Sequence, residues 1–118
     1  MRGECNLARC PKEPEFTYYD RYPLTNNDEA SVYRVREAFD EYFGENSVQI
    51  SKQSASEDFS IVANAFNTPY AYWGLGGFED MKNAPGNHNP AFAPDLQPTL
   101  NRGLESAVVA ACAWLACD

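Results

Sequence analysis

The chain is poor in histidine, in basic side chains and in long apolar runs, and each shortage argues against a class of protein. Its 118 residues include one histidine and 9 basic against 17 acidic side chains, which gives a net charge of −8. Nucleic-acid binding needs a basic surface that neutralises phosphates, so we expect no nucleic-acid partner. The same acidity disfavours anionic membrane surfaces, and no apolar run approaches the ~20 residues of a membrane helix, so we expect no membrane partner.

The start of the chain and its cysteines indicate the compartment. The segment from Met1 to Cys5 lacks the apolar core of a secretory signal peptide, so we expect a cytoplasmic protein. The four cysteines form two pairs, each with four residues between its members: Cys5 with Cys10, and Cys112 with Cys117. Zinc knuckles and redox motifs use a gap of two, so this spacing predicts four free thiols in a reducing compartment. A disulfide between the chain ends is the alternative.

The order of apolar patterns predicts a layered α/β fold. The length is close to the commonest domain size, and 44% of the residues are hydrophobic. Aromatic or alternating segments predict three strands, at residues 15–22, 47–51 and 70–75. Apolar residues at spacings of three and four predict three helices, which follow Asp28, Glu57 and Pro98. About three helices packed on a small sheet are therefore expected.

The ends and buried faces of these helices can also be predicted. Gly44 tolerates a positive φ and is expected to end the first helix. Ser54 and Glu57 fit a capping box at the start of the second helix, in which each side chain caps a backbone N–H of the other. The expected core residues are Val32, Val35 and Phe39 in the first helix, Phe59, Val62 and Phe66 in the second, and Leu100, Leu104, Val108, Ala111 and Leu115 in the third.

Three side chains are candidates for chemistry. His88 lies on a loop, residues 76–98, whose glycines and prolines can hold an imidazole rigidly. An imidazole can ligate zinc, manganese or cobalt, although a single loop histidine more often serves only as a hydrogen-bonding group. Glu57 and Asp58 are adjacent acids at a helix start, where capping and the helix dipole explain them. The alternative is that one of these acids faces a catalytic cleft.

Other patterns in the sequence carry no chemistry. The glycines from Gly74 to Gly77 are followed by no Lys-Ser/Thr pair and open no helix, so they do not form a phosphate-binding loop. With one histidine and no flanking signature, the sequence does not support a Ser/His/Asp triad. The aromatic residues Tyr70, Tyr72 and Trp73 are more typical of a core than of a ligand-stacking surface.

Four motifs, taken in order, resemble the C-terminal part of a known enzyme family. They are the segments Tyr22–Asp28, Ser54–Ser60, Thr68–Gly77 and Asn87–Pro94. Their order and spacing are similar to those of the metal-dependent amidohydrolases of the aminoacylase and carboxypeptidase type, with the hippurate and N-acyl-amino-acid hydrolases as the nearest group. The resemblance runs from about Glu15 to Leu115, and residues 1–12 resemble nothing in that family.

The resemblance implies a division into domains. Residues 15–25 would be the terminal strand of a smaller lid domain that dimerises, so a homodimer is expected. Residues 26–118 would be the C-terminal part of the catalytic domain, and residues 1–14 an irregular N-terminal segment. The substrate would be a small N-acyl amino acid or a peptide.

The resemblance also implies roles for the candidate residues. His88 matches a histidine that ligates one of two divalent metal ions, which could be zinc, manganese or cobalt. Glu57 and Asp58 lie on a segment beside that site, in supporting roles.

What the chain lacks limits these expectations. It has no second histidine and no Glu-Glu pair, whereas a catalytic zinc needs about three protein ligands. We therefore expect the isolated chain to be an inactive part of a hydrolase whose complete form uses metal-activated water. The alternative is a stand-alone interaction module that uses the aromatic segment 16–22 as an edge for pairing with another chain.

Overall fold

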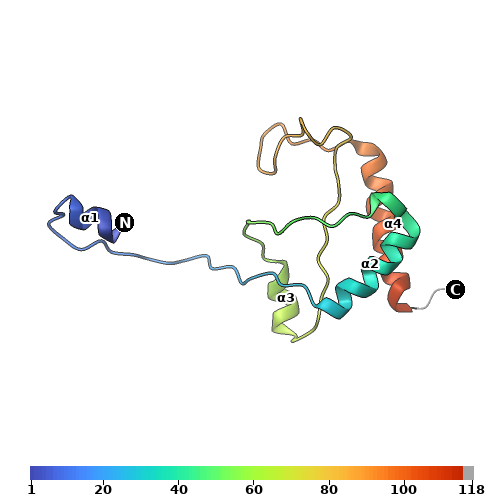
Figure 1. The fold of residues 1–118 in the computed structure, drawn as a ribbon, viewed down its shortest axis with the longest axis horizontal. Coiled ribbons are helices and arrows are strands. Elements are labelled where there is room, and N and C mark those ends of the chain that lie inside the picture. Colours follow the sequence, from blue (N-terminus) through green and yellow to red (C-terminus); the bar gives the residue numbers. More distant parts are fainter. Residues whose placement is uncertain (116–118) are drawn as a thin grey trace.

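The computed structural model describes residues 1–115, and within them it contains helices joined by extended chain (Figure 1). The elements are α1 (Arg2–Leu7), α2 (Glu29–Phe43), the short 3₁₀ helix η1 (Gly44–Asn46), α3 (Phe59–Ala65) and α4 (Leu96–Leu115). Residues 1–115 contain no β-strand. The predicted α/β fold, with about three helices packed on a small sheet, is therefore wrong.

The three segments predicted as strands lie outside any helix but do not pair into a sheet. A strand exists only where a neighbouring strand accepts its backbone N–H and C=O groups in a ladder. In the part of the chain described, no main-chain hydrogen bond joins two of these segments; the Tyr70 C=O accepts from the N–H of Asp28, which lies outside all three, at 2.9 Å. The aromatic and alternating residues of these segments favour an extended backbone, but they do not specify a second strand with which it could pair.

Helix α2 begins, ends and packs as its sequence predicts. The Asp28 carboxylate accepts hydrogen bonds from the Ser31 N–H at 2.8 Å and from the Ser31 hydroxyl at 2.7 Å, which makes Asp28 the N-cap. Gly44 follows Phe43 with a φ of 55°, a conformation that glycine adopts without steric cost. Val35 is buried on the predicted face, which confirms the helical period.

The predicted core face of α3 is wrong. The helix forms where it was expected, but its buried residues are the small Ser60 and Ala63. Phe59, Val62 and Phe66, which the spacing predicted to be in the core, are exposed. Among residues 1–115 no other helix packs against α3; the rings of Tyr70 and Tyr72 meet Phe59, and Val62 and Phe66 stay 65 and 79% exposed.

Helix α4 also turns its most apolar face to solvent. It packs on α2, as Figure 1 shows, through a face whose buried residues are Ser106 and Ala110. Small side chains let two helix axes approach closely, and this decides which face is covered. The large apolar side chains predicted for the core are exposed instead: Leu100, Leu104, Val108 and Leu115. None of the helices described here, α4 included, has the length and apolarity needed to cross a membrane.

Two cation–π contacts join α2 to α4. The Arg34 guanidinium lies 4.8 Å from the ring centre of Trp114, and the Arg102 guanidinium lies 5.8 Å from that of Phe43. A cation over an aromatic face at such distances is attracted by the electron density of the ring. The helix pair is therefore held at both ends by arginines that also cover apolar surface.

The chain is spread out rather than closed around one core. Its Cα radius of gyration is 20.2 Å, against about 13 Å for a compact domain of this length. The buried hydrophobic residues among those described are Val35, Ala63 and Ala110. Figure 1 shows α1 at the end of a long arm, well away from α2, α3 and α4. The helix pair and the loops around it therefore form the body of the molecule.

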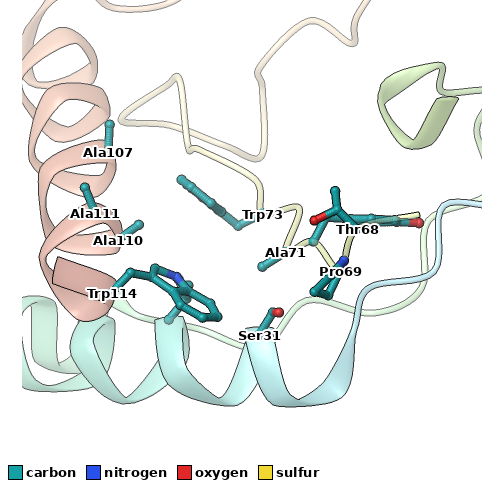
Figure 2. A pocket seen from close by; sticks show the side chains of 11 residues that line it. Ser31, Thr68, Pro69, Ala71, Trp73, Ala107, Ala110, Ala111 and Trp114 are labelled. Carbon is teal, nitrogen blue, oxygen red and sulfur yellow. The ribbon is translucent and has the colours of Figure 1, made fainter. Parts of the chain in front are cut away.

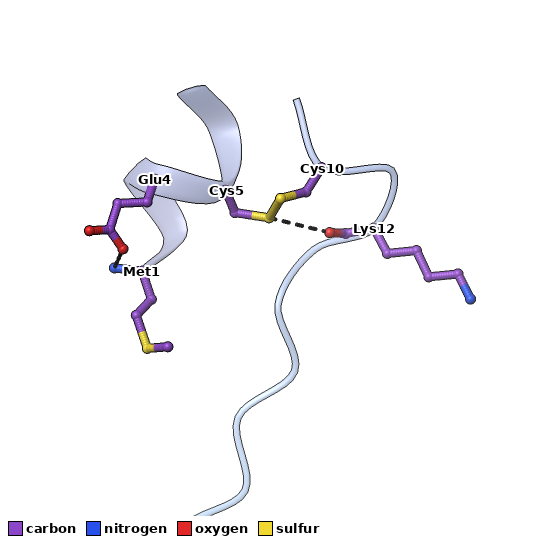
Figure 3. The surroundings of a disulfide bond; sticks show 5 residues. All are labelled: Met1, Glu4, Cys5, Cys10 and Lys12. Carbon is purple, nitrogen blue, oxygen red and sulfur yellow. Dashed lines mark hydrogen bonds and ion pairs between the residues drawn. A yellow bond between two sulfur atoms is a disulfide. The ribbon is translucent and has the colours of Figure 1, made fainter. Parts of the chain in front are cut away.

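The prediction of four free thiols is wrong for the first pair of cysteines. Cys5 in α1 and Cys10 in the turn after it form a disulfide (Figure 3). The Cys5 sulfur also lies 3.6 Å from the carbonyl oxygen of Lys12. This bond excludes the alternative disulfide from Cys5 or Cys10 to the other end of the chain, where Cys112 is half-buried in α4 and Cys117 lies outside the described residues.

Candidate functional site

Glu57 lies just before α3 and accepts three hydrogen bonds. Its Oε1 accepts from the backbone N–H groups of Asp58 and Phe59, at 3.0 and 3.1 Å. Its Oε2 accepts from the Tyr72 hydroxyl at 3.0 Å. Glu57 thus satisfies N–H groups that the first turn of a helix leaves without partners. The predicted capping box is wrong, because among residues 1–115 Ser54 makes no hydrogen bond to the start of α3.

These bonds favour the ionised form of Glu57 and the neutral form of Tyr72. The backbone N–H of Phe59, and next the Tyr72 hydroxyl, lower the pKa of Glu57 from its ordinary value of 4.5. The same carboxylate raises the pKa of Tyr72 from its ordinary value of 10.0. A carboxylate with a lowered pKa and three donors is a weak proton acceptor, so its geometry suits a positioning role better than proton transfer.

Tyr72 is held from its other sides by an aromatic ring and an amide. The ring of Phe59 stacks on it with centres 4.6 Å apart and planes at 24°. The Asn27 side chain bonds to the Tyr72 backbone twice at 2.8 Å, with Oδ1 accepting from the N–H and Nδ2 donating to the C=O. Phe59 also meets Tyr70 edge to face at 5.5 Å. We call Asn27, Glu57, Phe59, Tyr70 and Tyr72 the Glu57 cluster.

Asp58 has a different environment from its neighbour. Its backbone N–H donates to Glu57, and its side chain lies near enough to Glu57 and Tyr72 to contribute to the lowered pKa of Glu57 and the raised pKa of Tyr72. The residue is exposed at the start of α3. Of the two candidate acids, Asp58 is therefore the more open to solvent.

His88 lies on a loop whose two ends are tied together. The Asp95 N–H donates to the Gly77 C=O at 2.8 Å, and the Asp95 carboxylate accepts from the Glu79 N–H at 2.8 Å. A Cβ atom on Gly77 would lie 3.2 Å from the Cβ of Pro94, so the close approach of the ends favours glycine there. We call residues 77–95 the Asp95 loop; its joined ends are typical of a compact functional loop.

Contacts inside the Asp95 loop hold the backbone around His88. The rings of Phe78 and Phe92 meet edge to face at 5.4 Å. The Asn89 N–H donates to the Gly86 C=O at 3.2 Å, and the Asn89 side chain accepts from Ala91 N–H at 2.8 Å. The loop is therefore packed by its own side chains and turns.

His88 has an uncommon backbone conformation and an open side chain. Its φ is 66°, in the left-handed region that residues other than glycine seldom adopt. Its side chain is exposed and makes no hydrogen bond to the rest of the described chain. The loop thus presents an exposed imidazole.

The candidate residues do not come together in one site. Glu57 and Asp58 precede α3, whereas the Asp95 loop lies at the other end of the body of the molecule (Figure 1). Nowhere in residues 1–115 do three His, Cys, Asp or Glu side chains gather closely enough to hold a metal ion. Because a catalytic metal site needs about three protein ligands, the donors described here do not fit a complete one.

An apolar hollow of about 530 Å³ lies between α2, α4 and residues 68–73 (Figure 2). Figure 2 shows Trp73 on one wall and Trp114 on another, with the alanines of α4 between them. The lining contains Ser31 and Thr68 but no carboxylate, imidazole or thiol. The hollow therefore offers neither a general base nor a metal ligand, and none of the three candidate residues lines it.

Comparison with known families agrees with the motifs that surround these residues. The family model of Peptidase family M20/M25/M40 matches residues 9–110, which include the Glu57 cluster, the Asp95 loop and most of α4. This confirms the resemblance at the level of the peptidase family, without distinguishing the aminoacylase and hippurate-hydrolase group within it. The match spans most of the chain, and the chain belongs to Peptidase family M20/M25/M40.

Proposed function

We propose that the chain is part of a metal-dependent hydrolase of amide bonds, in which His88 supplies one metal ligand. Membership of a peptidase family supports the hydrolase class. The construction of the Asp95 loop is the observation that carries the ligand role. Hydrogen bonds of Asp95 join the two ends of the loop, and a turn within the loop holds the backbone next to His88. His88 itself has a φ of 66° and presents one exposed imidazole. A neutral imidazole is a ligand that suits zinc, manganese or cobalt.

The remaining ligands must come from outside the described residues. One imidazole does not make a metal site, and the two candidate acids lie at the other end of the body. We therefore propose that the isolated chain binds divalent metal weakly and has no hydrolase activity.

The proposed substrate is a small N-acyl amino acid or a small peptide. The four motifs that resemble the aminoacylase and hippurate-hydrolase group support this choice, at a finer level than the family match. In this proposal Glu57 acts by positioning Tyr72, because its carboxylate is engaged by three donors. Asp58 offers an exposed carboxylate beside it.

Metal titration of the chain tests the ligand role of His88. Calorimetry with zinc chloride should give a dissociation constant weaker than about 1 µM, and His88→Ala should abolish the binding. Asn87→Ala, a change at the adjacent loop residue that keeps the imidazole, is the matched control. Sub-micromolar binding lost in His88→Ala would show that the chain already holds a full ligand set. Equal binding by wild type and His88→Ala would refute the ligand role.

A stand-alone interaction module is the second candidate. It is favoured by the segment 16–22, which is extended and carries exposed aromatic side chains at Tyr18, Tyr19 and Tyr22. Such a segment can pair with an edge of another chain.

The size of the protein in its source cells separates the two candidates. An immunoblot with an antibody against α4 measures it directly. A band several times the 13.2 kDa of this chain would support the hydrolase, in which His88, Glu57 and Asp58 can then be tested by mutation. A band at 13.2 kDa would favour the interaction module.

A further inference from the structure

Helix α1 ends in a turn that brings Cys10 back beside Cys5. Arg9 has a φ of 50°, in the left-handed region, and its N–H donates to the Asn6 C=O at 3.1 Å. The N–H of Cys10 then donates to the C=O of Cys5 at 2.9 Å, which completes a Schellman motif. In this motif an apolar side-chain contact commonly joins the two residues that stand in these positions. Here the disulfide joins them, between Cα atoms 5.2 Å apart.

The other contacts of α1 are too weak to keep it helical. The helix has six residues, none of them buried, and no other helix of the part described packs on it. An isolated helix shorter than about 12–15 residues is marginal in water. The Met1 amino group pairs with Glu4 at 3.4 Å, but both are 84% exposed, so the pair contributes little. The Arg2 guanidinium lies 5.6 Å from the ring centre of Phe16, a contact made on the extended arm itself.

The turn carries a steric cost that the disulfide offsets. In the left-handed region the Cβ of Arg9 crowds the following carbonyl group, which a glycine would avoid. When the bond between Cys5 and Cys10 is cleaved, this cost remains and the covalent closure is lost. The folded state of α1 therefore depends on the disulfide.

The disulfide is open to attack by thiols (Figure 3). Cys10 is exposed and Cys5 is half-buried, on an arm that holds α1 away from the other helices (Figure 1). Residues 1–12 carry three basic side chains against one acidic, in a chain whose net charge is −8. A thiol attacks a disulfide as its thiolate anion, which this positive segment attracts. The exposed Cys10 sulfur is the point of attack.

We propose that the Cys5–Cys10 bond is a reversible thiol–disulfide switch, in which α1 is folded in the disulfide state and unfolded in the dithiol state. Its reaction partner is a dithiol. One sulfur of the dithiol attacks Cys10 as a thiolate, the bond to Cys5 breaks, and Cys5 takes up a proton from water. The second sulfur of the dithiol, also as a thiolate, attacks the first and releases Cys10, which takes up a proton. Two electrons thus pass to the cysteine pair, and the dithiol becomes a disulfide.

The switch is separate from the proposed hydrolase. The arm holds α1 well away from the body, which contains the Glu57 cluster and the Asp95 loop (Figure 1). No other described helix packs on α1, so its unfolding should leave the helix pair of the body intact.

Nuclear magnetic resonance of the 118-residue chain in both redox states tests the switch. The Cα chemical shifts of residues 2–7 should be helical in the oxidised chain and should lose more than about half of their helical displacement in excess dithiothreitol. They should return when glutathione disulfide replaces the dithiothreitol. The shifts of Val35 and Ala110, which are buried in the body, should not change. Mass spectrometry of alkylated peptides shows which cysteines are bonded in each state.

Cysteine variants identify the bond that controls α1. Cys10→Ser should give the unfolded α1 shifts without dithiothreitol. Cys112→Ser changes a cysteine of α4 in the same way and is the matched control, so it should keep the wild-type response. Helical α1 shifts that survive reduction, an oxidised chain without the Cys5–Cys10 bond, or Val35 and Ala110 shifts that change with those of α1 would overturn the proposal.

Two variants of Arg9 test the role of the turn. Arg9→Gly and Arg9→Ala both remove the guanidinium, but only glycine adopts the left-handed φ without steric cost. In a titration with reduced and oxidised glutathione, Arg9→Gly should close the disulfide with an equilibrium constant at least about threefold above that of Arg9→Ala. Equal closure in the two variants would also overturn the proposal, because the turn would then not govern the pairing of the cysteines.

Discussion

The Tyr72 hydroxyl donates a hydrogen bond to the Glu57 carboxylate at 3.0 Å, across 15 positions of sequence. The other oxygen of the same carboxylate accepts the first N–H groups of α3. One side chain therefore both caps α3 and joins it to the extended segment that carries Tyr72. Loss of its charge should weaken the cap and the junction together.

Acid should remove the contribution of Glu57 to stability. Its folded-state pKa lies below 4.5, so the ionised form stabilises the fold. That contribution is complete above pH 4.5 and is lost as the pH falls through the lowered pKa. The melting temperature of Glu57→Gln should therefore lie below that of the wild type at neutral pH and approach it in strong acid. A gap that does not depend on pH would contradict this account.

Alkali should act on the other partner of the same bond. The pKa of Tyr72 is raised above 10.0 by Glu57, so the neutral phenol stabilises the fold. The contribution is fully present below pH 10.0 and is lost as the pH rises through the raised pKa. Phenolate absorbance should show two tyrosines that titrate late, Tyr72 beside Glu57 and Tyr33 beside Glu37. The pKa of Tyr72 should fall in Glu57→Gln, and the late step should lose one tyrosine in Tyr72→Phe.

Removal of the α2 cap should shorten or loosen that helix. Asp28→Ala deletes both bonds to Ser31 and should lower the helical signal and the melting temperature by several degrees. Asp28→Asn keeps a side-chain oxygen that can accept the Ser31 N–H, and it is the matched control. Equal losses in the two variants, measured by circular dichroism, would mean that the cap is not what Asp28 contributes.

The two faces of α4 should respond oppositely to mutation. Ala110 is buried against α2, so Ala110→Leu should overpack the helix pair and cost about 1–3 kcal/mol. Leu104→Ala removes an exposed side chain and should cost much less. Denaturant unfolding followed by circular dichroism checks both. A larger loss in Leu104→Ala would place the core on the other face.

Loss of the Asp95 carboxylate should open the loop that carries His88. In Asp95→Ala the Glu79 N–H loses its acceptor, so its hydrogen exchange should accelerate together with cleavage of residues 78–94 by proteases. Asp80→Ala is the control, because Asp80 accepts hydrogen bonds only from Lys82 and Asn83 within its own turn. Loop cleavage that is faster in Asp80→Ala than in Asp95→Ala would argue against the role of Asp95.

Features that depend on a few neighbouring residues could be predicted from the sequence. The start of α2 at Asp28, its end at Gly44 and the burial of Val35 follow from capping, positive φ and helical period. The helices after Glu57 and Pro98 follow from the same local signals.

Features that depend on distant partners could not be predicted. The helical period of α4 shows where its apolar residues lie, but it does not show which face of the helix packs against another element. In the structure α2 packs against the face that carries Ala110. The sequence of segment 70–75 favours an extended backbone, but it does not determine which strand, if any, pairs with it. The bonds that Asn27 and Asp95 make could not be predicted, because their partners lie 45 and 16 positions away in the sequence.

The pairing of Asn27 with the Tyr72 backbone restricts how the two segments can slip. When two β-strands pair, a shift by two residues keeps every side chain on the same face of the sheet and gives the backbone groups new partners. Here both bonds are made by one planar side-chain amide, so they form together and break together. A slip of two residues would bring Thr25 or Glu29 to the position of Asn27, and neither carries an amide. The register between the two segments is therefore set by the Asn27 amide together with the bond from the Asp28 N–H to the Tyr70 C=O, and a slipped pairing would lose all three bonds.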